Sequence, residues 1–188
     1  MMKNNLIVIF SFLLVTNTFS QTVSNTATSE GKTKSKITYS QYDITLALKG
    51  NPNAGVTDQY TKDKESILLP DGLGAKIGYG LHFNNWVALG IHTGINWEWE
   101  NKLVVVPVFA NFKLSPKISR DTRIVLQLGL GKAAALGRGS LSGDYKKISL
   151  GLQSEDVLFF IEISQYDFPI NNQENSGNIS LGLAVVTF

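Results

Sequence analysis

The feature that most constrains this chain is a period-two alternation of large apolar residues with small or polar ones. In residues 72–83 one face carries leucine, isoleucine, tyrosine, phenylalanine and alanine, while the other carries four glycines with Lys76 and His82. A period of two is typical of a strand whose two faces meet different surroundings. Seven further segments follow the same pattern, which makes eight in all: 42–48, 87–97, 104–114, 123–131, 147–153, 157–164 and 179–185.

The chemistry of the two faces indicates which of them points outward. Charged residues make up only 17% of the chain, against roughly 25% in soluble domains. The small-residue face is therefore too poor in charge for a solvated exterior, whereas a narrow interior favours glycine and lipid favours Leu, Ile, Val and Phe. Only a closed sheet satisfies every strand backbone group in lipid. We predict an all-β fold, an eight-stranded antiparallel up-and-down transmembrane β-barrel.

The N-terminal residues have the anatomy of a secretory signal peptide. Lys3 precedes an apolar run at residues 6–15, and Thr18 and Ser20 are small residues placed before a cut at Gln21. A run of this length is too short to span the ~30 Å hydrocarbon core as a helix. We expect a signal peptide at 1–20, a flexible periplasmic tail at 21–39 and an outer-membrane barrel at 40–188.

The links between the predicted strands alternate in length. Asn84-Asn85, Glu155-Asp156 and residues 115–122 are short or moderate, whereas 49–71, 98–102, 133–144 and 167–177 form the other set. Transmembrane barrels have short periplasmic turns and longer outer loops, so both termini are expected in the periplasm. The longest link, 49–71, is the candidate contact for an extracellular ligand.

Aromatic residues near the strand ends are expected to form two girdles at the membrane interfaces. They are Tyr42, Phe83, Trp86 and Phe112 at the periplasmic side, and Trp97, Trp99, Tyr166 and Phe168 at the outer side.

Six charged residues fall on the face assigned to the interior, and a charge in a narrow lumen must be paired or hydrated. We expect a network of crossed ion pairs that fills the lumen, formed by Asp43, Lys76, Lys113, Arg123, Lys147 and Glu162.

The chemistry-bearing residues do not favour catalysis or a cofactor. The only histidines are His82 and His92, and Thr93 next to the latter points to lipid and cannot serve it as a nucleophile. Two histidines on different strands make a poor metal site, and the absence of cysteine excludes a thiolate site. We expect no catalytic residues, no metal and no cofactor. The formal net charge of +2 is too small to indicate a nucleic-acid-binding surface.

The signal peptide, the eight strands and the terminal Phe188 resemble small outer-membrane barrels of the OmpX and OmpA-transmembrane-domain type. Residues 107–113 (PVFANFK) resemble a strand of porin-like barrels of Bacteroidetes. The resemblance implies contact with outer-membrane lipid and lipopolysaccharide, and insertion by the outer-membrane assembly machinery, which reads a C-terminal aromatic residue. Strict alternation places Phe188 inward; either a bulge near Val185-Val186 shifts the phase, or Phe188 is not the residue that is read.

Taken together, the sequence favours a Gram-negative outer-membrane barrel with a structural or surface-interaction role and no catalysis. The alternatives are a narrow porin-like channel, opposed by an interior filled with side chains, and a lipid A-modifying enzyme, opposed by the missing catalytic triad. A soluble periplasmic barrel holding a small ligand would need a charged exterior.

Overall fold

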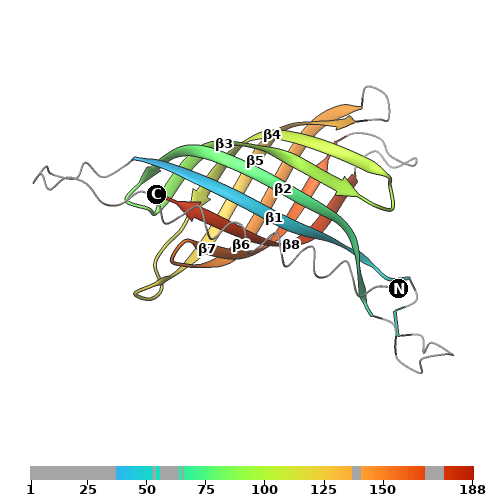
Figure 1. Cartoon of the computed structure of the whole chain (residues 1–188), viewed down its shortest axis with the longest axis horizontal. Coiled ribbons are helices and arrows are strands. Elements are labelled where there is room, and N and C mark those ends of the chain that lie inside the picture. Colours follow the sequence, from blue (N-terminus) through green and yellow to red (C-terminus); the bar gives the residue numbers. More distant parts are fainter. Residues whose placement is uncertain (1–36, 53, 56–63, 65, 137–140, 168–175) are drawn as a thin grey trace, which may run out of the picture. The chain divides into compact units, whose positions relative to one another are not determined.

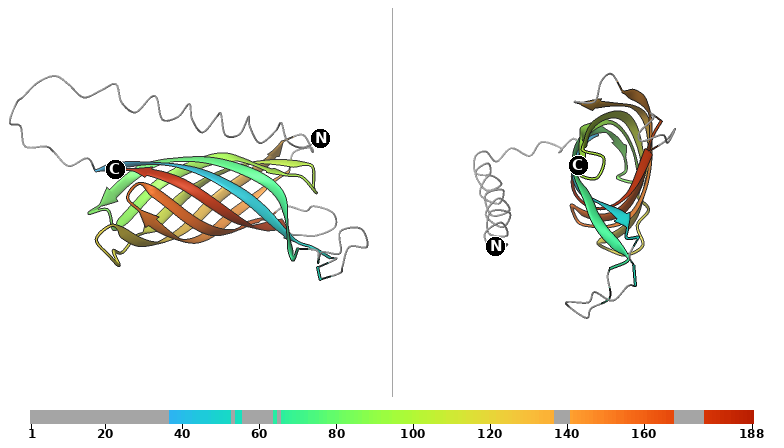
Figure 2. Two further views of the ribbon diagram at one scale, coloured as in Figure 1. Left: turned by 60° about the horizontal axis from the view of Figure 1, so that its bottom comes forward. Right: turned by 90° about the vertical axis from the view of Figure 1, so that its right-hand side faces the viewer.

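The computed structural model describes residues 37–52, 54–55, 64, 66–136, 141–167 and 176–188. These residues form a closed barrel in which each strand pairs antiparallel with its neighbours in sequence and the last strand pairs with the first (Figure 1; Figure 2). The predicted eight-stranded barrel is thus confirmed. Its strands are β1 (Thr38–Gly50), β2 (Leu68–Phe83), β3 (Val87–Glu98), β4 (Leu103–Leu114), β5 (Thr122–Leu136), β6 (Ser142–Ser154), β7 (Val157–Tyr166) and β8 (Ser176–Thr187). The described residues contain no helix that is long and apolar enough to cross a membrane.

Every strand separates an apolar outer face from a small or polar inner face. In β2, Ile77 and Tyr79 are exposed, whereas Lys76, which precedes Ile77 and points to the opposite face, is buried. The register keeps like faces together, since Ile77 lies opposite Tyr42 of β1 and Thr93 of β3. Exposed large apolar residues continue in this way around all eight strands. An unbroken apolar belt on a closed sheet is what a hydrocarbon environment requires.

The lumen is narrow, and glycine is required where a large inward side chain crosses it. A Cβ atom at Gly78 would collide with the imidazole ring of His92, and one at Gly182 would collide with the ring of Phe160. The alternation of glycine with apolar residues therefore reflects crowding inside the barrel, as the sequence suggested.

The two ends of the barrel differ in their connections. The turn end carries the links 84–86, 115–121 and 155–156 together with Thr38 and Thr187, and the loop end carries the other four links. At the turn end Asn84 and Asn85 have φ values of 48° and 56°. The backbone N–H of Trp86 donates to the carbonyl of Phe83 at 3.0 Å and closes the turn around these two residues. Positive φ at both central residues is typical of a type I′ turn, and asparagine tolerates it well.

Strands β1 and β2 extend further than the alternation predicted. Strand β1 begins at Thr38, inside the segment interpreted as a tail, and continues to Gly50, so the link expected at 49–71 shortens to 51–67. The pairing moves from Ala47–Gly72 to Leu48–Pro70, which leaves Asp71 as an extra residue in a bulge. This bulge interrupts the period of two, so the alternation alone assigns residues 68–71 to the link and not to the strand.

Phe188 lies on the lumen side of the barrel. The β1–β8 pairing runs without a shift from Leu48–Ile179 to Ser40–Thr187, so no bulge alters the phase of β8. The ring of Phe188 is half-buried and packs edge-on against His82, with 4.9 Å between the ring centroids. Of the two alternatives left by the sequence, the phase shift is the one that the structure excludes.

Candidate functional site

An ion-paired cluster fills the middle of the lumen. Glu162 of β7 pairs with Lys76 of β2 through Oε1 and with Lys147 of β6 through Oε2, the latter at 2.9 Å. All three side chains are almost fully buried. The ammonium group of Lys147 also lies 5.2 Å from the centroid of the Phe109 ring. The cluster connects strands on opposite sides of the barrel and leaves the carboxylate satisfied on both oxygens.

The other three charged residues of the predicted network do not join an ion pair among the described residues. Asp43 is buried and accepts a hydrogen bond from Gln41 at 2.8 Å. Lys113 donates to Gln153 at 3.1 Å, and Arg123 donates to the backbone carbonyl of Asn85 at 2.5 Å. The expectation of one ion-pair network through all six residues was therefore too broad. Arg123 lies near the turn end, where a rim carbonyl is available to it, and Lys113 finds an amide instead of a carboxylate.

Uncharged polar residues occupy the level next to the cluster, and sequence reasoning did not single them out as a group. Asn111 donates to Gln127 at 3.0 Å, and Gln41 donates to the same amide oxygen at 3.3 Å. The hydroxyl of Tyr39 lies 3.1 Å from Nε2 of His92. The period of two already placed these residues inward, but it contained no information on which of them meet.

Aromatic rings close the lumen on the loop-end side of the cluster. Tyr145 and Tyr166 stack with 5.5 Å between their centroids, and Phe109 lies 4.9 Å from Tyr145. Tyr166 is 0% exposed, so its assignment to the outer aromatic girdle was wrong. The alternation itself places Tyr166 inside the barrel, because this residue is two positions from the inward Ser164 and four from Glu162.

Six of the predicted girdle residues are exposed on the outer face. They are Tyr42, Phe83, Trp86, Phe112, Trp97 and Trp99, and the last two form an edge-on pair with centroids 6.4 Å apart. The eighth, Phe168, lies outside the described residues.

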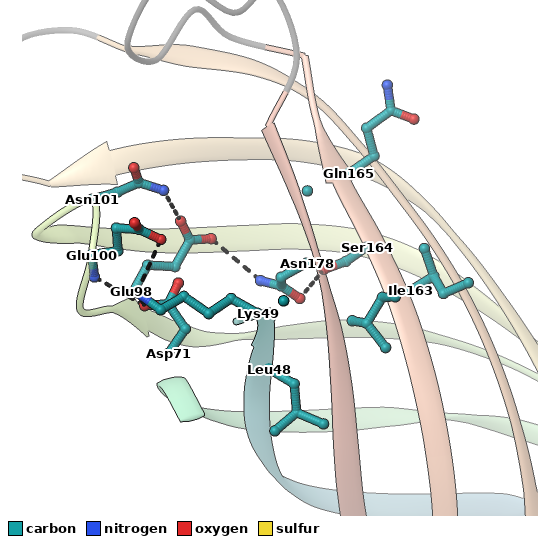
Figure 3. Close-up of a pocket in the computed structure, with 13 residues that line it drawn as sticks. Leu48, Lys49, Asp71, Glu98, Glu100, Asn101, Ile163, Ser164, Gln165 and Asn178 are labelled. Carbon is teal, nitrogen blue, oxygen red and sulfur yellow. Dashed lines mark hydrogen bonds and ion pairs between the residues drawn. The ribbon is translucent and has the colours of Figure 1, made fainter. Parts of the chain in front are cut away.

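A cavity of ≈ 730 Å³ opens at the loop end between β1 and β8 (Figure 3). We call it the mouth cavity, and its polar side is lined by Lys49, Asp71, Glu98, Glu100, Asn101 and Asn178, among others. The ammonium nitrogen of Lys49 lies 3.2 Å from Oε2 of Glu100 and 3.7 Å from Oδ1 of Asp71. The bulge in β2 gives Asp71 its position, and its carboxylate also accepts the backbone N–H of Glu100 at 3.1 Å.

Glu98 is the buried acid of the mouth cavity. It is 4% exposed and accepts hydrogen bonds from Asn101 at 3.0 Å and from Asn178 at 3.3 Å (Figure 3). No lysine or arginine of the described chain forms an ion pair with it. In the sequence analysis Glu98 belongs to a link and not to the inner face. Glu98 is two residues after the inward Asn96, so the period of two already placed it inside the barrel.

Neither histidine stands in a catalytic arrangement. His92 is fully buried at the level of Tyr39 and Phe109, while His82 packs against Phe188 near the turn end. Within the described ranges, no group of three histidine, cysteine or acidic residues is arranged to hold a metal ion.

Comparison with known proteins gives the fold but no close relative. No protein-family model matches the chain, and no curated protein matches its sequence. Among solved structures, the outer membrane enzyme PagL matches with a TM-score of 0.51 at 12% identity, covering 76% of this chain and 98% of that one. Neisserial surface protein A matches with a TM-score of 0.49 at 13% identity, covering 80% and 97%. Ail of Yersinia pestis, solved in a phospholipid bilayer nanodisc, matches with a TM-score of 0.44 at 15% identity, covering 79% and 99%.

At these identities the likeness concerns the fold alone, and the location follows from the chemistry of the barrel's faces. The outer face is apolar on every strand, while the inner face buries ionised and amide side chains that lipid would not accept. A closed antiparallel barrel with this inversion of faces is stable in a membrane and would aggregate in water. The chain is an eight-stranded β-barrel protein of the Gram-negative outer membrane.

Proposed function

We propose that this protein is a barrel closed to solutes that acts by binding at its loop end and catalyses no reaction. The observation that carries the proposal is the filled lumen. The cluster around Glu162 and the rings of Tyr145 and Tyr166 occupy successive levels of the interior. An eight-stranded barrel has an interior just wide enough for its side chains, so we expect these layers to leave no aqueous path.

The proposed orientation places the loop end outside the cell and the turn end in the periplasm. The lengths of the links support it, because the two shortest links, 84–86 and 155–156, lie at the turn end and the two longest, 51–67 and 167–175, at the loop end. Transmembrane barrels keep their short turns in the periplasm. In this orientation the mouth cavity and the hairpin end that joins β1 to β2 face the environment. Loops carried by a rigid barrel are the parts that are free to make interactions.

The alternative of a lipid-modifying enzyme has less support. A hydrolase of the serine type needs a nucleophile, a base and an orienting carboxylate in hydrogen-bond contact. The ring of His92 instead lies against the hydroxyl of Tyr39, fully buried inside the lumen, and His82 contacts Phe188. The likeness to PagL concerns the fold and does not bring an activity to this chain.

Solute flux through reconstituted protein tests the proposal. Liposomes that contain the refolded barrel should swell in isotonic arabinose no faster than empty liposomes, and planar bilayers should show no stable conductance steps. A general porin in the same liposomes serves as the positive control. Swelling or stepwise conductance with the purified barrel would support the channel alternative and contradict the closed lumen.

A further inference from the structure

The wall of the barrel opens sideways at the loop end. The pairing between β1 and β8 ends at Leu48–Ile179, although both strands continue beyond this point. Strand β1 goes on to Gly50 while paired only with β2, and β8 extends back to Ser176 while paired only with β7. The edges of the two strands therefore separate without a ladder between them. The mouth cavity lies at this opening, with Lys49 and Asn178 on its two sides (Figure 3).

The lining of the mouth cavity is amphipathic, because the opening exposes residues from both faces of the wall. Leu48, Ile163 and Ile179 belong to the outer, lipid-facing side of their strands. Glu98 and Ser164 are buried on the inner side. One cavity thus joins an apolar surface that lies toward the membrane to a polar surface at the barrel mouth. Its volume of ≈ 730 Å³ is within the range of small-molecule sites, about 300–1,000 Å³.

The cavity lies at the depth where the apolar belt ends. On β7 the outward residue after Ile163 is Gln165, and on β8 the outward residue before Ile179 is Gly177. Leu48 is followed on β1 by Lys49 and Gly50. This change from Leu and Ile to polar or small residues marks the boundary between hydrocarbon and head groups. A lipid in the leaflet would therefore bring its head group to the level of the polar lining.

The charges of the lining select a positive head group. Three carboxylates, those of Asp71, Glu98 and Glu100, share one ammonium group, that of Lys49. Lys49 pairs with the other two acids, and Glu98 is left buried with amide partners alone within the described chain. A buried carboxylate is stabilised most by a cation that completes its charge balance.

We propose that the mouth cavity binds a lipid of the surrounding membrane whose head group carries a protonated amine. The ammonium group pairs with Glu98, and one acyl chain lies along Leu48, Ile163 and Ile179. This assignment rests on the proposed function, since it names the class of ligand that the loop end takes. The open seam gives such a lipid a lateral entry, so that it reaches the site without leaving the membrane.

Native mass spectrometry of the full refolded protein in a neutral detergent tests the proposal. The probe is lysophosphatidylethanolamine, and its N-acetylated form is the control because it keeps the phosphate and the acyl chain while a small neutral amide replaces the charged amine. We expect one bound molecule of the probe, and at least about tenfold weaker binding of the acetylated form, since the acetylated head group cannot pair with a buried carboxylate. Equal binding of the two forms would overturn the role of the amine.

Two variants locate the site. Glu98→Gln keeps the shape of the side chain and should weaken binding of the probe at least about tenfold. Glu155→Gln, which changes an exposed acid at the turn end, should leave binding unchanged. Gly50 lines the cavity, and a Cβ atom there would meet nothing within 4 Å, so the indole of Gly50→Trp has room to occupy the cavity. This variant should also abolish binding. Each variant must retain the heat-dependent gel shift of the folded barrel. Undiminished binding by folded Glu98→Gln and Gly50→Trp would place the lipid elsewhere and overturn the proposal.

Conductance measured on the same preparation separates this inference from the proposed function. A closed barrel that retains no aminolipid contradicts the lipid site alone, and leaves the loop end to bind something else. A conducting barrel contradicts the closed lumen, whatever lipid it retains.

Discussion

The ammonium group of Lys147 lies 2.9 Å from Oε2 of Glu162, with both side chains buried inside the barrel. Lys76 pairs with the other carboxylate oxygen, so two cations from different strands depend on one acid. Removal of that acid leaves both cations buried without a direct ion-pair partner, which is far more costly than the loss of an exposed pair.

Replacement of Glu162 by alanine should therefore lower the free energy of unfolding by about 3 kcal/mol or more. Guanidinium unfolding of the barrel in detergent micelles, followed by the gel shift, measures the change. Glu155→Ala at the exposed turn provides the control, with an expected effect within about 0.5 kcal/mol. Wild-type stability of Glu162→Ala would mean that water already screens the two lysines.

The apolar belt predicts the behaviour of the protein in cells and on gels. It should sediment with outer membranes and migrate faster in an unheated sample than in a boiled one, because a closed barrel resists unfolding by dodecyl sulfate until it is heated. Fractionation and paired gel lanes check this outcome. Recovery in the soluble periplasmic fraction without a gel shift would contradict the membrane assignment.

The orientation of the barrel predicts where trypsin cuts on intact cells. Lys64 is exposed in the 51–67 link, and cleavage there or at Lys62, which lies outside the described residues, is expected. Lys117 and Arg120 are exposed in the link between β4 and β5 and should be protected until the outer membrane is permeabilised. Mass spectrometry of the released peptides distinguishes the sites. Cleavage at Lys117 with protection at Lys64 would invert the proposed topology.

The 51–67 link is expected to be dispensable for assembly. Its replacement by a two-residue turn keeps Lys49 and Asp71, which belong to β1 and β2, and should yield a barrel with an unchanged gel shift. Any binding of a soluble extracellular ligand through this link should be lost, as measured with labelled cells. A failure to assemble would show that the link, which includes the hydrogen bond from the Asn51 nitrogen to the Ile67 carbonyl oxygen at 2.9 Å, is needed for folding.

A substitution at Phe188 tests two roles of this residue separately: recognition by the assembly machinery in cells, and stability of the folded barrel. Because Phe188 lies on the lumen side without a phase shift, we expect that it is not the residue that the assembly machinery reads, so Phe188→Ala should leave the folded fraction in cells close to that of wild type. A several-fold loss would show that the machinery reads Phe188 in spite of its inward position. The purified variant should refold with only a modest loss of stability, since the ring is half-buried against Tyr39 and His82. Tyr39→Phe, which preserves the ring contact, is the control. Equal folded fractions of wild type and Phe188→Ala in cells would exclude Phe188 as the signal.

The sequence by itself determined the number of strands, the face of each residue and the environment of the barrel. The reason is that the period of a strand is local, so that the parity of Lys76 or Tyr145 along its own segment decides whether it points inward. The same rule would have placed Tyr166 and Glu98 correctly, had it been applied to the ends of their strands.

Only the tertiary structure decided which inward residues meet. Lys76 and Glu162 are 86 positions apart, and their contact depends on the registers of all the strands and on the closure of the barrel, which no local pattern encodes. The bulge at Asp71 and the opening between β1 and β8 are likewise properties of strand pairing. Backbone hydrogen bonding between distant segments therefore fixed the mouth cavity, and local alternation supplied the side chains that line it.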